Sequence, residues 1–94
     1  MIKGITSTGF EYEYDAERLD DMRFVDVLAV VVDPKGPAFE KIAGLSQLLT
    51  MILGADMKDA LYDHIGKKYG GRVPRADLQQ ALEEIMQAKD AEKN

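Results

Sequence analysis

The chain has 94 residues, of which 46% are hydrophobic and 31% are charged, a balance typical of one ordinary globular domain. Its net charge of −5 and its scattered basic residues disfavour a nucleic-acid-binding face, which would need clustered cations to displace counterions from phosphate. The absence of cysteine excludes disulfides, thiolate zinc sites and cysteine nucleophiles, and it fits a reducing cytosol.

No long apolar segment is visible in the sequence. Lys3 is followed by GITSTGFEYEYD, which is not the apolar core of a secretory signal. The longest apolar runs fall far short of the roughly 20 residues that a membrane span needs. We therefore expect a soluble cytoplasmic protein that does not bind a membrane.

Residues 1–14 carry the two-residue alternation of a half-buried strand. The aromatic residues of FEYEY lie on one side of this strand, and its glutamates lie on the other. A single strand is not stable alone, so it must pair either with residues 2–7 or with a neighbouring subunit. We predict an N-terminal β arm or hairpin here.

Acidic residues stand where they can cap the next elements. Asp15 suits the start of a short turn, and Asp20 or Asp21 suits the start of MRFVDVLAVVV. The five valines of this segment favour a strand, but clean two-residue alternation is absent. We predict a helix over residues 22–32, which the following DPKGP loop ends.

The stretch AFEKIAGLSQLLTMILG, residues 38–54, has the widest apolar arc in the chain. Its apolar side chains cover about half of a helix circumference, whereas a surface helix needs an arc of only about 100°. This helix must therefore be covered from more than one side. Gly54 ends it, and an amphipathic helix over residues 56–65 follows after a tight turn.

The C-terminal third predicts a turn and one more helix. Gly70 and Gly71 mark the turn, and Pro74 suits the first position of a helix that reaches about Lys89. The apolar residues of this helix all face one way.

These elements together predict a mostly α (α+β) fold in one domain, residues 1–94. About four short helices form a compact bundle with an N-terminal β arm or hairpin. The parts are the β arm (1–14), the helical domain (15–89) and a polar, frayed tail (90–94).

Residues that could carry chemistry are sparse. His64 is the sole histidine and lies on the apolar side of its helix, so we interpret it as a packed, hydrogen-bonded side chain and not as a metal ligand. No serine stands in a G-x-S-x-G context, and the acidic residues between 15 and 26 lack EF-hand spacing. We predict no enzyme activity, no cofactor and no metal.

The order of the elements resembles a known family. The segments that carry the resemblance are, in order, FEYEYDAERLDDMRFVDVLA, LLTMILG, MKDALYDHI, GRVP and ADLQQALEEIM. This order of segments is similar to that of the short tail assembly chaperones of long-tailed (siphovirus-type) bacteriophages and prophages. The resemblance covers about residues 10–86 and rests on fold-forming residues. Met22 and Arg23 depart from the family pattern, in which a larger aromatic residue often follows the acid pair.

The resemblance implies a helical, non-enzymatic protein of the bacterial host cytoplasm. Such a chaperone binds the tape measure protein, keeps its hydrophobic helices from aggregating, helps to recruit tail tube subunits and leaves before the virion is finished. The resemblance also implies self-association. The acidic charge balance and the short apolar runs predict no binding to nucleic acid or membrane.

We expect the wide apolar arc, together with the helix over residues 22–32, to bind tape measure helices or other copies of the chain. The apolar excess could also be satisfied entirely within the fold. The candidate partner-binding residues are Phe24, Leu28, Phe39, Ile42, Leu45, Leu48, Leu49, Ile52 and Leu53.

Two other classes of function stay open at this stage. A structural or adaptor component of the virion, of the head-tail joining type, would remain in mature particles. A small transcription or antitoxin-type regulator would bind DNA, which the acidic balance of the chain disfavours.

Overall fold

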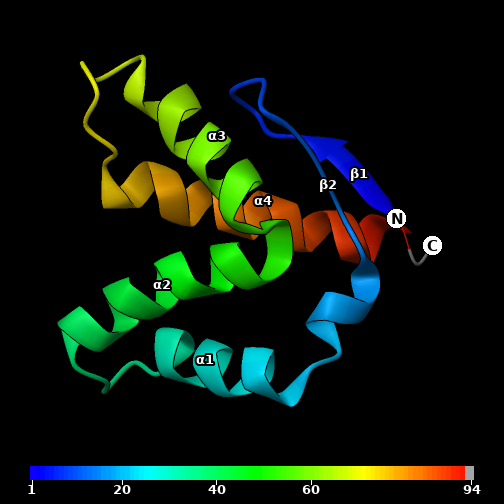
Figure 1. Cartoon of the computed structure of the whole chain (residues 1–94). Helices are drawn as coiled ribbons and strands as arrows, with labels where there is room; N and C mark the ends of the chain where they lie inside the picture. Colours follow the sequence, from blue (N-terminus) through cyan, green and yellow to red (C-terminus); the bar gives the residue numbers. More distant parts are fainter. Residues whose placement is uncertain (93–94) are drawn as a thin grey trace.

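The computed structural model describes residues 1–92, with side chains up to residue 88, as four α-helices and an N-terminal hairpin (Figure 1). This arrangement confirms the predicted mostly α fold. The elements are β1 (Ile2–Ile5), β2 (Glu11–Tyr14), the short 3₁₀ helix η1 (Ala16–Leu19), α1 (Met22–Val32), α2 (Ala38–Leu53), α3 (Ala55–Gly66) and α4 (Arg75–Glu92).

Helix α2 lies at the centre of the molecule. It contacts α1, α3, α4, β2 and η1, and Figure 1 shows α1 running alongside it. Leu48, Leu49 and Ile52 of α2 are fully buried by these neighbours. The prediction that this helix is covered from more than one side is confirmed.

The two strands pair with each other. They run antiparallel, with Ile2 opposite Tyr14, and β1 packs against α4. Phe10, Tyr12 and Tyr14 are buried while the glutamates between them are exposed, as the alternation predicts. The Tyr14 hydroxyl donates a hydrogen bond of 3.0 Å to the backbone carbonyl of Ile85 in α4.

Aspartates cap the first two helical segments as expected. The Asp15 carboxylate accepts a hydrogen bond from the Glu17 amide at 3.0 Å, and the Asp21 carboxylate accepts one from the Arg23 amide at 2.9 Å. Of the two candidate caps for α1, Asp21 therefore takes the role. Gly54 separates α2 from α3 at a φ of 83°, a backbone conformation that side-chain-bearing residues rarely adopt.

The last helix differs from the prediction at both ends. Pro74 precedes α4 instead of starting it, and its carbonyl accepts a hydrogen bond from the Leu78 amide at 3.2 Å. The helix continues to Glu92, beyond the predicted end at Lys89 and into the segment expected to be a polar tail. Residues 93 and 94, the rest of that segment, lie outside the described residues.

A glycine lies in the contact between α1 and α2. A Cβ atom added at Gly44 would lie 2.7 Å from Cγ2 of Val31 and 3.5 Å from Cγ1 of Val27. Because the first distance is shorter than carbon atoms tolerate, the absence of a side chain at Gly44 allows the two helices to pack this closely.

Candidate functional site

Most of the predicted partner-binding residues lie in the protein's own core. Six of the nine are buried, Leu28 is half-buried, and two are exposed. The buried residues are Phe24, Leu45, Leu48, Leu49, Ile52 and Leu53.

The reason is the central position of α2. Because α1, α3 and α4 all pack on it, the fold itself satisfies most of its wide apolar arc. Five of the six buried residues belong to this helix. Leu48, Leu49 and Ile52 among them are fully buried, so a partner cannot reach these three side chains in this conformation. The candidates for partner binding are therefore the predicted residues that remain exposed.

Phe39 and Ile42 are the two predicted residues that the structure leaves exposed. Phe39 is 87% exposed in the first turn of α2, and Ile42 lies one turn further on the same face. Burial of a phenylalanine ring stabilises a fold by about 1.5–3 kcal/mol. Because the Phe39 ring is exposed, the monomer gains almost none of this stabilisation from it.

Helix α1 adds four exposed apolar side chains. It packs mainly on α2, so its outer face is left uncovered. Together with Phe39 and Ile42, these side chains form what we call the α1–α2 surface. Its residues are Met22, Val25, Val30, Val32, Phe39 and Ile42.

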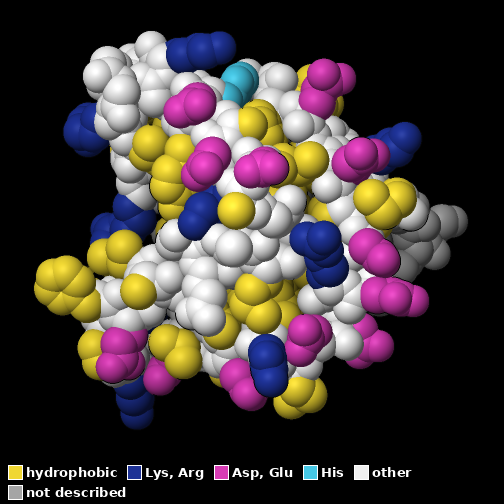
Figure 2. All heavy atoms as spheres, in the orientation of Figure 1, with side chains coloured by type: hydrophobic (Ala, Val, Ile, Leu, Met, Phe, Trp, Pro, Cys, Tyr) yellow, Lys and Arg dark blue, Asp and Glu magenta, His cyan; other side chains and the backbone are white. Residues whose placement is uncertain are grey.

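The space-filling view places much of this surface at one end of the molecule. Figure 2 shows hydrophobic side chains gathered where α1 ends and α2 begins, among charged side chains of both signs. Val32 and Phe39 stand on either side of the loop over residues 33–37 that joins these helices. Exposed apolar side chains rimmed by charged residues are typical of interaction sites.

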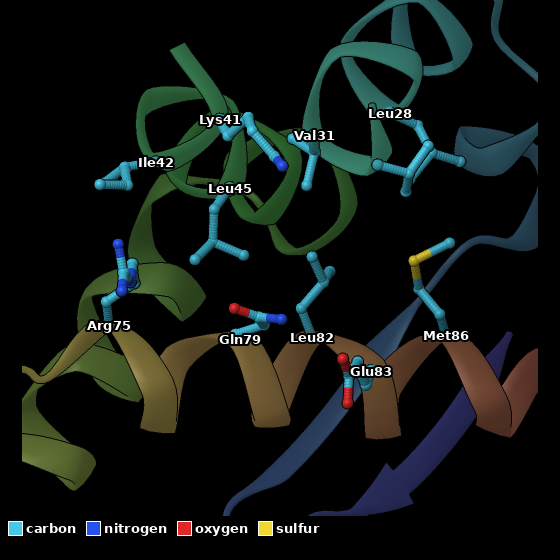
Figure 3. Close-up of a pocket in the computed structure, with 11 residues that line it drawn as sticks. Leu28, Val31, Lys41, Ile42, Leu45, Arg75, Gln79, Leu82, Glu83 and Met86 are labelled. Carbon is cyan, nitrogen blue, oxygen red and sulfur yellow. The ribbon is translucent and has the colours of Figure 1, made fainter. Parts of the chain in front are cut away.

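A groove of about 340 Å³ adjoins the α1–α2 surface and shares Val32 and Ile42 with it. We call it the α4 groove, because one wall is α4 and the opposite wall is formed by α1 and α2. Figure 3 shows Leu28, Val31, Leu45 and Leu82 directed into it. The remaining lining residues are Lys41, Arg75, Gln79, Glu83 and Met86.

The charged residues of the α4 groove sit at its rim. Lys41 comes from α2, Arg75 from the first turn of α4 and Glu83 from about two turns further along α4. Among the side chains that the structure describes, neither cation forms a salt bridge, and the ion pair within 4 Å is Lys3 with Glu13.

His64 has the packed position expected of it. Its Nε2 atom lies 3.1 Å from the Thr8 hydroxyl and 3.2 Å from the Thr8 carbonyl oxygen, to which it donates, and its ring packs 5.6 Å from that of Phe10. His64 therefore joins α3 to the hairpin.

The described residues offer no cluster of three or more histidine or carboxylate side chains that could hold a metal ion. None of the helices within residues 1–92 has both the length and the apolar character needed to cross a lipid bilayer.

Sequence reasoning placed the helix over residues 22–32 in the binding surface but named Phe24 and Leu28 from it and not its exposed apolar residues, and it did not identify the α4 groove. Met22, Val25 and Val32 recur at helical spacing with Ala29 between them, and that repeat was a usable signal for a second apolar face. No signal identified the groove, because Lys41 and Arg75 are brought together only by tertiary packing.

Comparisons with protein-family models, with curated proteins and with solved structures found no match for this chain.

Proposed function

We propose that this protein is a non-enzymatic tail assembly chaperone that binds and shields the apolar helices of a tape measure protein in the bacterial cytoplasm. The observation that carries the proposal is the α1–α2 surface, with its largely exposed phenylalanine. A chaperone for apolar helices needs apolar surface of its own that is not consumed by its core.

The size and shape of the molecule support the proposal. Its accessible surface is 6219 Å², whereas a folded monomer of 10.5 kDa typically exposes about 5,400 Å². The body is flattened, with extents of 35 × 34 × 21 Å.

The net charge also fits this role. A net charge of −5 favours the solubility of a chain that exposes apolar residues. The exposed apolar side chains of the α1–α2 surface support binding as the activity of this protein.

The test is co-expression with the tape measure protein of the same genome, with the soluble and co-purifying fractions of that protein measured. We expect the wild type to keep it soluble and a Val32→Ser/Phe39→Ser variant to lose most of this effect. Both positions are exposed, so the circular dichroism spectrum of the variant should match that of the wild type.

The matched control is Ile5→Ser, because Ile5 is 62% exposed on the hairpin and lies outside the α1–α2 surface. This control should solubilise the tape measure protein as well as the wild type does. If the double variant were as effective as the control, the surface assignment would be wrong. If this protein stayed in purified virions, a structural component would replace the chaperone as its function.

A further inference from the structure

The α4 groove has the length of a short helix but the volume of a few side chains. Residues 75–86 of α4 run along it, which corresponds to about 17 Å or three helical turns. Its volume of about 340 Å³ is at the small end of the range for binding pockets. A helix would therefore lie over the groove and insert its side chains from one face, at spacings such as i, i+4 and i+7.

The floor of the α4 groove suits such inserted side chains. Leu28 and Val31 from α1, Leu45 from α2 and Leu82 from α4 are apolar and come from three helices. Met86 closes one end, and its flexible thioether side chain can adjust to apolar groups of different shape.

The rim has a charge opposite to that of the whole chain. Lys41 and Arg75 contribute two positive charges against the single negative charge of Glu83, although the protein carries a net charge of −5. The amino-terminal end of the α4 dipole adds positive potential near Arg75. Neither cation is in a salt bridge with a described side chain, so both are available to an incoming carboxylate.

We propose that the α4 groove binds one amphipathic helix of about three turns whose apolar face carries acidic residues on the flank beside Lys41 and Arg75. This inference rests on the proposed function and specifies which kind of client helix the chaperone selects. An apolar helix with a basic flank would place like charges together at this rim and would bind more weakly.

The experiment uses three fluorescent synthetic peptides with identical apolar positions and with Glu, Gln or Lys on one flank. Their affinities for the full-length protein are measured by fluorescence anisotropy at low and at high salt. We expect the Glu peptide to bind most tightly, about tenfold more tightly than the Lys peptide, because two exposed ion pairs each change affinity a few-fold. The difference should shrink in 1 M salt.

Variants of the rim locate the effect. Lys41→Gln/Arg75→Gln should remove the preference for the Glu peptide while the Gln peptide still binds, and Glu83→Gln should strengthen binding of the Glu peptide. Lys67→Gln is the matched control, because this exposed lysine follows α3 and lies outside the groove. It should leave the order of the three peptides unchanged.

The outcomes separate this inference from the proposed function. Equal affinities, or tightest binding of the Lys peptide, would overturn the acidic preference but leave a chaperone for apolar helices intact. Failure of all three peptides, with the tape measure protein still solubilised, would show that clients dock elsewhere on the surface. A concentration-dependent dimer that Lys41→Gln/Arg75→Gln dissociates in sedimentation experiments would assign the groove to a second copy and overturn the inference.

Discussion

Replacing Gly44 with alanine should destabilise this protein, although alanine is the better helix former. The change would gain about 1 kcal/mol from helix propensity. It would also place a methyl group 2.7 Å from Cγ2 of Val31, about 1 Å closer than an ordinary contact. Valine has few alternative rotamers in a helix, so α1 must shift, and overpacking of this kind costs about 1–3 kcal/mol. The expected net loss is about 1 kcal/mol.

A second substitution should reverse the sign of this effect. In a Val31→Ala background, the nearest atom to the new methyl group is Cγ1 of Val27 at 3.5 Å, which is a normal distance. Gly44→Ala should then stabilise the protein by about 0.5–1 kcal/mol. The two sites would therefore couple by about 2 kcal/mol, well above the value for independent positions.

The assay is urea unfolding of the wild type, the two single variants and the double variant, followed by circular dichroism. Equal slopes of the free energy of unfolding against urea concentration would show that the four proteins expose similar surface areas when they unfold. If Gly44→Ala had the same effect with and without Val31, the close packing of α1 on α2 would not be the cause, and the reasoning would be refuted.

Three further predictions concern single side chains. Tyr14→Phe should cost about 1 kcal/mol in urea unfolding, because the hydrogen bond to the Ile85 carbonyl is lost, and an unchanged midpoint would contradict this. Burial, and to a smaller extent the Glu84 carboxylate, raises the pKa of Tyr12 above 10.0. The folded state therefore retains a proton that the unfolded chain releases, so stability from this group is complete below about pH 10 and is lost as the pH rises further. Tyr12→Phe should flatten the decline in melting temperature between pH 10 and 11, and an identical decline would argue against this role. Asp21→Ala should cost about 1 kcal/mol by removing the cap of α1, measured by urea unfolding against an Asp26→Ala control on the exposed face of α1.

The elements of this fold were predictable because their causes are local. Proline and glycine positions ended the helices, and the alternation of Phe10, Tyr12 and Tyr14 indicated the strand. The valine-rich segment was correctly assigned to a helix because its apolar residues follow a period near 3.6 and not 2.

The burial of each apolar residue was harder to predict, because it depends on how many other helices surround the helix to which the residue belongs. Leu49 and Phe39 belong to the same helix, yet one is fully buried and the other is 87% exposed. Leu49 lies where α2 is surrounded, whereas Phe39 lies in the first turn, before α3 and α4 cover the helix. The helical pattern places both residues on the same apolar arc and does not distinguish them. The predicted binding residues therefore included six that belong to the core.

The attachment of the N-terminal hairpin to the C-terminal half of the chain has a consequence for folding during synthesis. The Ser7 amide and hydroxyl donate to the Glu84 carboxylate across 77 positions of sequence, and Thr8 meets His64 across 56. A two-stranded hairpin is marginally stable alone, so β1 and β2 reach their stable contacts only after α3 and α4 have been synthesised. The hairpin precedes these helices in the sequence yet docks after them, and closure of this long loop should limit the folding rate.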